Sequence, residues 1–234
     1  MVASDRRIRR IVIAGLLLAI TLLLTLSNVA FISVPTPAGS ATIGHIPAII
    51  GGILEGPLVG VIVGLGFAFG SLMSPLVPVK DPLVVGLPRL FIGVTAAWTF
   101  VLLRKASKRV LALMLGLLLV LLLVWSYQIG LNSLWLGVIV AMIAVAGAAA
   151  LLWWLRREET YIIALAVAGV VGSLTNTVLV LGAAVWRQVI PDPKVALGIG
   201  LTQGIPEAIV SAVVVVAIVA ALQQIGKKRQ GSRL

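Results

Sequence analysis

Residues 134–155 read LWLGVIVAMIAVAGAAALLWWL, twenty-two residues without one charged side chain. About 20 consecutive apolar residues are needed for a helix to cross the roughly 30 Å hydrocarbon core of a bilayer. This stretch therefore predicts a membrane-spanning helix, and similar apolar runs recur on both sides of it.

The composition extends this interpretation to the whole chain of 234 residues. Hydrophobic residues make up 61% and charged residues only 11%, with a mean hydropathy of +1.19. An average soluble domain carries about 25% charged residues, so a soluble globular domain is excluded. The chain has no cysteine and a single histidine, which excludes disulfides and thiol catalysis and argues against a metal enzyme.

The apolar runs predict an all-α integral membrane protein, a single membrane domain over 1–234 with about eight membrane segments. These segments are 8–34, 43–54, 58–73, 84–103, 110–125, 134–155, 161–186 and 196–225. The second is too short to span confidently, and we expect it to pack as a tilted or partial helix.

Lysine and arginine are distributed unevenly between the turns. Fourteen of the eighteen basic residues fall at 6–10, 104–109, 156–157 and 227–233. These positions lie on one side of the membrane if eight segments alternate. Because cytoplasmic loops are enriched in basic residues, we expect a multi-pass protein of the cell membrane with both termini cytoplasmic. The first apolar run is long for a signal peptide, so we expect a retained helix.

The few polar groups inside the apolar segments are the candidate functional residues, because such groups are costly in lipid and usually face a cavity or a partner. With the orientation above they fall in the outer half of the membrane, which predicts a pocket open to the outside and not a pore. The candidate substrate-binding residues are Asn28, His45, Arg89, Asn176, Thr177, Gln203 and Glu207.

Several of these residues have an alternative structural interpretation. Asn176 could hydrogen-bond a neighbouring helix, and Arg89 and Glu207 could form an ion pair. His45 could be an N-terminal cap of the segment that continues through Pro47. The glycines at 60, 64 and 70 favour close helix packing over substrate contact. Gly204 and Pro206 predict a kink in the last segment.

Small side chains also mark the first segment. Ala14, Gly15 and Ala19 lie on its cytoplasmic half, and the last two are four residues apart. Small residues at this spacing let another helix approach closely, either within the chain or on a partner.

Three stretches of the chain resemble the substrate-binding S component of an energy-coupling factor (ECF) vitamin transporter. The first is the basic N-terminus followed by IAGLLLA at 13–19. The second is ATIGHIPAIIGG at 41–52, followed by Glu55-Gly56-Pro57 and a glycine-rich segment to Leu72. The third is GSLTNTVLVLG at 172–182. The second and third look most like the pantothenate branch of the family.

The resemblance implies a six-helix core, here 8–106 and 160–226, with 110–155 as an extra helix pair. It implies high-affinity binding of one vitamin from outside and docking on a membrane coupling subunit driven by two cytoplasmic ATPases. The chain itself has no P-loop, so the ATP is used by those partners and no cofactor is bound by this chain. Ala14, Gly15 and Ala19 would form the coupling-subunit interface. For pantothenate, Arg89 would pair the carboxylate, while Asn176 and His45 would hydrogen-bond the rest.

Three other classes of function remain at this point. An ion-gradient-driven secondary transporter predicts ionisable groups deep in the inner half, which the sequence lacks. A membrane-embedded enzyme needs a nucleophile–base pair or metal ligands, which one histidine without cysteine does not supply. A structural membrane subunit leaves the clustered polar groups unexplained.

Overall fold

The computed structural model describes residues 3–33, 40–131, 134–157 and 159–231. It is 84% helical, and five helices in the described part are long and apolar enough to cross a membrane. Two further apolar helices, Ile46–Glu55 and Pro57–Met73, are shorter. The expectation of an all-α membrane protein is confirmed. Val34 and Arg233, which ended the first predicted segment and the basic tail, lie outside the described residues.

The chain forms two compact units. One comprises Met1–Val101 and Ala164–Leu234, and the other comprises Leu102–Ile163. Among the described residues, the first unit contains seven helices, wholly or in part: α1 (Ala3–Leu26), α2 (Ile46–Glu55), α3 (Pro57–Met73), α4 (Leu87–Leu103), α7 (Thr160–Trp186), α8 (Pro193–Ile199) and α9 (Ile205–Gly231). Two π-helical segments, η1 (Pro82–Gly86) and η2 (Gly200–Gly204), precede α4 and α9.

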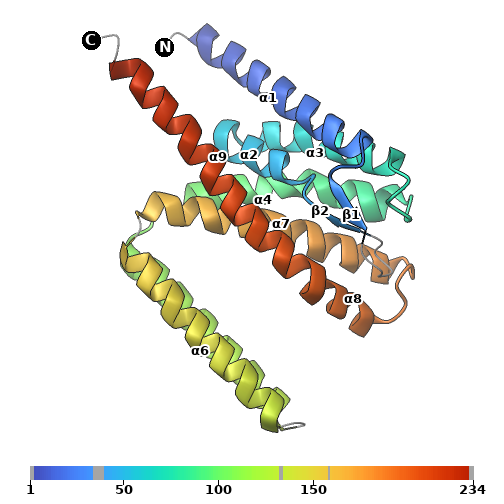
Figure 1. The fold of residues 1–234 in the computed structure, drawn as a ribbon, viewed down its shortest axis with the longest axis vertical. Helices are drawn as coiled ribbons and strands as arrows, with labels where there is room; N and C mark the ends of the chain where they lie inside the picture. Colours follow the sequence, from blue (N-terminus) through green and yellow to red (C-terminus); the bar gives the residue numbers. More distant parts are fainter. Residues whose placement is uncertain (1–2, 34–39, 132–133, 158, 232–234) are drawn as a thin grey trace. The chain divides into compact units, whose positions relative to one another are not determined.

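The first helix ends earlier than predicted. It stops at Leu26, and Asn28 adopts a left-handed backbone with φ of 62°. Asparagine tolerates this conformation better than most residues, so it can end a helix inside an apolar run. The chain then forms a short antiparallel pair, β1 (Phe31–Ser33) and β2 (Ser40–Thr42), in which Phe31 lies opposite Thr42 (Figure 1).

Close packing of α2, α3 and α4 depends on glycine. A Cβ added at Gly52 or Gly60 would collide with the backbone of Gly93, and one added at Gly64 would collide with the carbonyl of Arg89. Only a residue without a Cβ allows backbones to approach this closely. The predicted packing role of Gly60 and Gly64 is confirmed, and Gly70 likewise packs against Thr25 of α1.

Helix α1 lies beside α2 and α3 and presents its other side outward (Figure 1). Large apolar side chains on that outward side, such as Ile11 and Leu23, are mostly exposed. Exposed apolar side chains are what a lipid-facing surface requires, because acyl chains are as apolar as leucine.

The second unit is a helical hairpin of α5 (Lys108–Gly130) and α6 (Leu134–Arg157), which pack on each other. Its outward side chains are apolar and exposed, among them Leu113, Trp135 and Met142. The basic ends meet, since Lys108 Nζ donates to the carbonyl of Arg156 at 3.3 Å. This unit corresponds to the extra helix pair of the sequence analysis.

Candidate functional site

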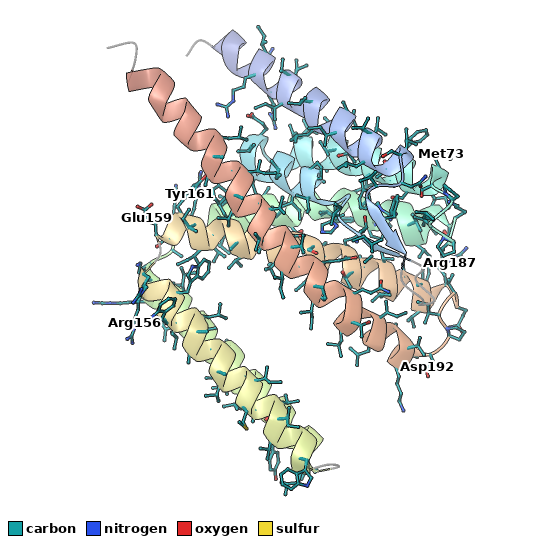
Figure 2. All side chains as sticks on the ribbon, in the orientation of Figure 1. Met73, Arg156, Glu159, Tyr161, Arg187 and Asp192 are labelled. Carbon is teal, nitrogen blue, oxygen red and sulfur yellow. The ribbon has the colours of Figure 1, made fainter. Side chains whose placement is uncertain are left out.

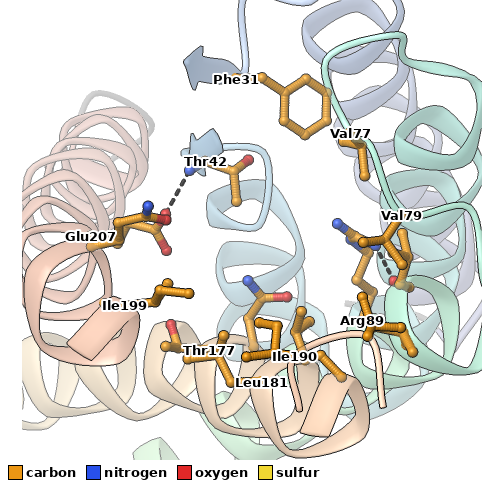
Figure 3. Close-up of a pocket in the computed structure, with 18 residues that line it drawn as sticks. Phe31, Thr42, Val77, Val79, Arg89, Thr177, Leu181, Ile190, Ile199 and Glu207 are labelled. Carbon is orange, nitrogen blue, oxygen red and sulfur yellow. Dashed lines mark hydrogen bonds between the residues drawn. The ribbon is translucent and has the colours of Figure 1, made fainter. Parts of the chain in front are cut away.

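A pocket of about 90 Å³ lies within the first unit, where α4, α7, α9, both π-helical segments and the β1–β2 pair converge (Figure 3). Its lining is mostly branched aliphatic, with a few polar side chains among them. The lining residues are Phe31, Thr42, Val77, Val79, Val84, Val85, Arg89, Asn176, Thr177, Val180, Leu181, Ala184, Val189, Ile190, Ile199, Gln203, Gly204 and Glu207. Apolar walls with few polar groups are typical of small-molecule sites.

Arg89, the third residue of α4, brings a buried positive charge to the wall. Only 5% of the residue is exposed. Its Nη1 donates to the carbonyl of Val85, one turn earlier in η1, and its guanidinium carbon lies 4.4 Å from the ring centre of Phe67. Its Nε has no hydrogen-bond partner among the described residues. A buried guanidinium with an unused donor is prepared for an anionic group.

Glu207 lies on the opposite side of the pocket, at the start of α9 (Figure 3). Its Oε1 accepts a hydrogen bond of 2.6 Å from the backbone N–H of Thr42 in β2. The short β-pair therefore fixes the position of the carboxylate. One oxygen is held by the protein, and the carboxylate remains an acceptor for a ligand hydroxyl or amide.

Arg89 and Glu207 do not form the ion pair that the sequence left open. No nitrogen–oxygen contact within 4 Å joins them, and the salt bridges among the described residues are Arg9–Glu55 and Arg187–Asp81. The two opposite charges instead face the same cavity from different walls. This arrangement favours a ligand with an anionic end and a hydrogen-bonding end.

Asn176 and Thr177 reach the pocket from α7, and Gln203 reaches it from η2. Asn176 is 6% exposed, and its Oδ1 has no partner among the described residues. Gly204 permits η2 to lie against α7, because a Cβ there would come within 2.7 Å of the Thr177 methyl. Where the sequence predicts a kink at Gly204 and Pro206, the structure has the π-helical segment η2, which ends at Gly204. Such segments often occur at functional sites.

Two candidate residues lie outside the pocket lining. His45 is fully buried at the start of α2, and its Nε2 lies 2.8 Å from the Ser211 hydroxyl of α9. It occupies the N-cap position without a capping side-chain hydrogen bond. Asn28 accepts a hydrogen bond from the hydroxyl of Ser74. Both side chains connect elements of the fold.

Two loops at the pocket end are tied together. The segment between α3 and η1 supplies Val77 and Val79 to the lining, and the turn between α7 and α8 supplies Val189 and Ile190. Arg187 Nε donates to Asp81 Oδ2 at 2.8 Å, which joins the first segment to the second. This hydrogen bond lowers the pKa of the Asp81 carboxyl below its ordinary value. Arg187 lies in the α7–α8 turn (Figure 2).

The small residues of α1 lie on its outward side. Gly15 and Ala19 are exposed and Ala14 is half-buried. A Cβ added at Gly15 would meet nothing within 4 Å. In the described part of the chain, no other helix packs against Gly15.

The structure adds site residues that the sequence did not indicate. The N–H of Thr42 holds Glu207, and a backbone donor leaves no mark in a sequence. Phe31 was assigned to a helix, and the valines of the loop and η1 look like any apolar residue in lipid. No cluster of three potential metal ligands occurs in the described part of the chain.

Comparison with curated proteins finds no match. A family model described as "ECF transporter, substrate-specific component" matches residues 9–219. The match extends from α1 into α9 and includes every residue that lines the pocket. Proteins of this family are substrate-binding transport subunits and not enzymes. Helical content, apolar spans, a pocket with two facing charges and the family match agree, and the chain belongs to the S components of ECF transporters.

Proposed function

We propose that this S component binds a carboxylate vitamin, with pantothenate as the best candidate, in the pocket between Arg89 and Glu207. Family membership implies association with a membrane coupling subunit and ATPases. The observation that carries the substrate proposal is the buried guanidinium of Arg89, with its unused Nε, on a mostly aliphatic wall.

The chemistry of pantothenate matches the walls group by group. Its carboxylate suits the guanidinium fork of Arg89. Its amide suits Asn176, whose Oδ1 needs a donor because an unpaired buried acceptor costs about 1–3 kcal/mol. Its hydroxyl groups suit the carboxylate of Glu207. Its branched methyl groups suit the aliphatic side chains of Val180 and Leu181.

The size of the pocket adds a step to binding. Ligand pockets usually enclose about 300–1,000 Å³, whereas this cavity encloses about 90 Å³. The lining must move outward to admit a vitamin. We infer that the two loops joined by Asp81 and Arg187 move, because each loop contributes lining residues and neither loop is helical. In this proposal the pocket opens to the outside.

Energy coupling is proposed to act through the outward surface of α1. Gly15 and Ala19 offer a site where a helix of the coupling subunit can approach closely. They lie near the middle of α1, whereas the chain reaches the pocket only beyond the end of that helix, at Phe31. A coupling surface on α1 that is separate from the pocket lining is consistent with separate binding and energising steps.

The substrate proposal is tested by extracting small molecules from the purified protein and identifying them by mass spectrometry. Pantothenate in the extract, absent from an Arg89→Gln preparation, is the expected result. A different carboxylate vitamin in the extract would support the pocket as the binding site but change the substrate that is assigned to it. A neutral compound retained by Arg89→Gln would contradict the role of Arg89.

A further inference from the structure

A second crevice, of about 470 Å³, lies in the first unit at the N-terminal end of α1. Its lining combines basic and apolar residues: Arg7, Arg9, Arg10, Gly52, Ile53, Leu54, Glu55, Gly56, Pro57, Ala97, Trp98 and Val101. The proposed transport function uses none of them. The crevice therefore needs its own explanation.

The charges in this crevice are not balanced. Arg9 is paired, since its Nη2 lies 2.9 Å from Glu55 Oε1 and its Nε donates to the same oxygen at 3.0 Å. Glu55 is the only carboxylate among the lining residues. The guanidinium of Arg10 lies over the α2–α3 turn, with Nη2 3.6 Å from the position of a Cβ at Gly56. Arg7 and Arg10 thus supply two positive charges for which the lining has no counterpart.

The depth of the crevice in the membrane follows from α1. From Arg10 to Leu26 the helix rises about 24 Å at 1.5 Å per residue, and beyond Leu26 the chain reaches the pocket through Phe31. Since the hydrocarbon core is about 30 Å thick, the crevice lies near the headgroups of the leaflet opposite the pocket. Trp98 borders it and is 65% exposed, as expected of an aromatic side chain at the interface.

We propose that this crevice binds the headgroup of an anionic phospholipid, with the phosphate held by Arg7 and Arg10. Guanidinium groups match phosphate geometry through paired hydrogen bonds, and basic pockets between membrane helices bind anionic headgroups. The apolar rim distinguishes a lipid from a soluble anion. Trp98 and Val101 are exposed beside the arginines, where the acyl chains of a bound lipid would lie.

The test uses delipidated full-length protein in detergent and native mass spectrometry with phosphatidylglycerol or phosphatidylcholine of identical acyl chains. We expect one phosphatidylglycerol to bind at least about ten-fold more tightly than phosphatidylcholine. In Arg7→Gln/Arg10→Gln, which retains the Arg9–Glu55 pair, affinity for phosphatidylglycerol should fall by at least about ten-fold, because two charge-assisted contacts are lost. Inorganic phosphate at the same concentration should not displace the lipid.

The matched control is Lys105→Gln/Arg109→Gln, which removes the same charge from exposed residues outside the crevice. It should bind phosphatidylglycerol as the parent does. Equal losses in both double variants would show general attraction to a basic protein and overturn the site. Displacement by inorganic phosphate would make it a soluble-anion site and also overturn the proposal. If the crevice variant does not fold, equal binding of the two lipids by the parent protein is sufficient to refute it.

Discussion

Replacing Arg89 with glutamine removes the buried guanidinium from the pocket wall and keeps a polar side chain of moderate length. In the structure Arg89 holds Val85 and stacks on Phe67, so the variant should also lose some stability. The effect on binding is separate. A hydrogen bond to a charged group contributes about 1.5–3 kcal/mol, and each 1.4 kcal/mol is about ten-fold in affinity. We expect pantothenate to bind roughly ten- to hundred-fold more weakly.

Because of Glu207, we expect the loss of affinity in Arg89→Gln to lie toward the upper end of this range. Its carboxylate lies on the opposite side of the same pocket, so without Arg89 an anionic ligand meets a negative wall. For a neutral ligand this repulsion is absent. Substituting the alcohol analogue pantothenol, which lacks the carboxylate, isolates the contribution of Arg89.

The assay is titration calorimetry of both ligands against the parent protein and Arg89→Gln. The parent should prefer pantothenate to pantothenol, and the variant should lose most of that preference. The matched control is Lys194→Gln, a cation removed from the exposed start of α8 outside the lining. It should leave both affinities unchanged. An Arg89→Gln protein that still prefers pantothenate by the parental factor would refute the assigned role.

Four further outcomes are expected. Gly15→Leu should abolish uptake and leave ligand binding intact, because a Cβ at this position lies in open space and Gly15 does not line the pocket; equal loss of both in transport and calorimetry would contradict this. Replacing 110–155 by a short polar linker should preserve binding, since no residue of that stretch lines the pocket; a folded variant without binding would show the opposite. Gly64→Ala should lower the unfolding temperature, with a cost of about 1–3 kcal/mol from overpacking against the Arg89 carbonyl; an unchanged melting curve would refute the tight contact. Arg187 lowers the pKa of Asp81, so the pair is intact above about pH 4 and is lost only as the pH falls through that lowered pKa. The ion pair should therefore be intact between about pH 5 and pH 8, and ligand dissociation measured by stopped flow in this range should be a few-fold faster in Asp81→Asn than in the parent.

The sequence predicted the membrane class and most of the helices because a long apolar run has one stable solution in lipid. It also placed five candidates, Arg89, Asn176, Thr177, Gln203 and Glu207, that the structure finds around one pocket. Gln203 and Glu207 are spaced i, i+4, which keeps their side chains on one helix face, and polar groups on such a face tend to meet.

The remaining features depend on information that hydropathy does not contain. The depth of a residue in the membrane does not determine which neighbour its side chain contacts. The side chain of His45 contacts Ser211, and that of Asn28 contacts Ser74. Strand β1 has only three residues and comes at the end of the apolar run that begins in α1, so its sequence resembles the end of a helix. The β1–β2 pair contacts Glu207 through the backbone N–H of Thr42. Every residue except proline has such a backbone donor, so the sequence does not mark this one.

We propose that this chain selects a vitamin and that partner ATPases supply the energy for its uptake. Uptake of labelled vitamin should be measured in cells producing this chain with the coupling subunit and ATPases, and in matched cells whose ATPases cannot hydrolyse ATP. We expect uptake only in the first cells, while purified protein from both retains the vitamin equally. Uptake by this chain alone, abolished by collapsing an ion gradient, would contradict this proposal and identify a secondary transporter.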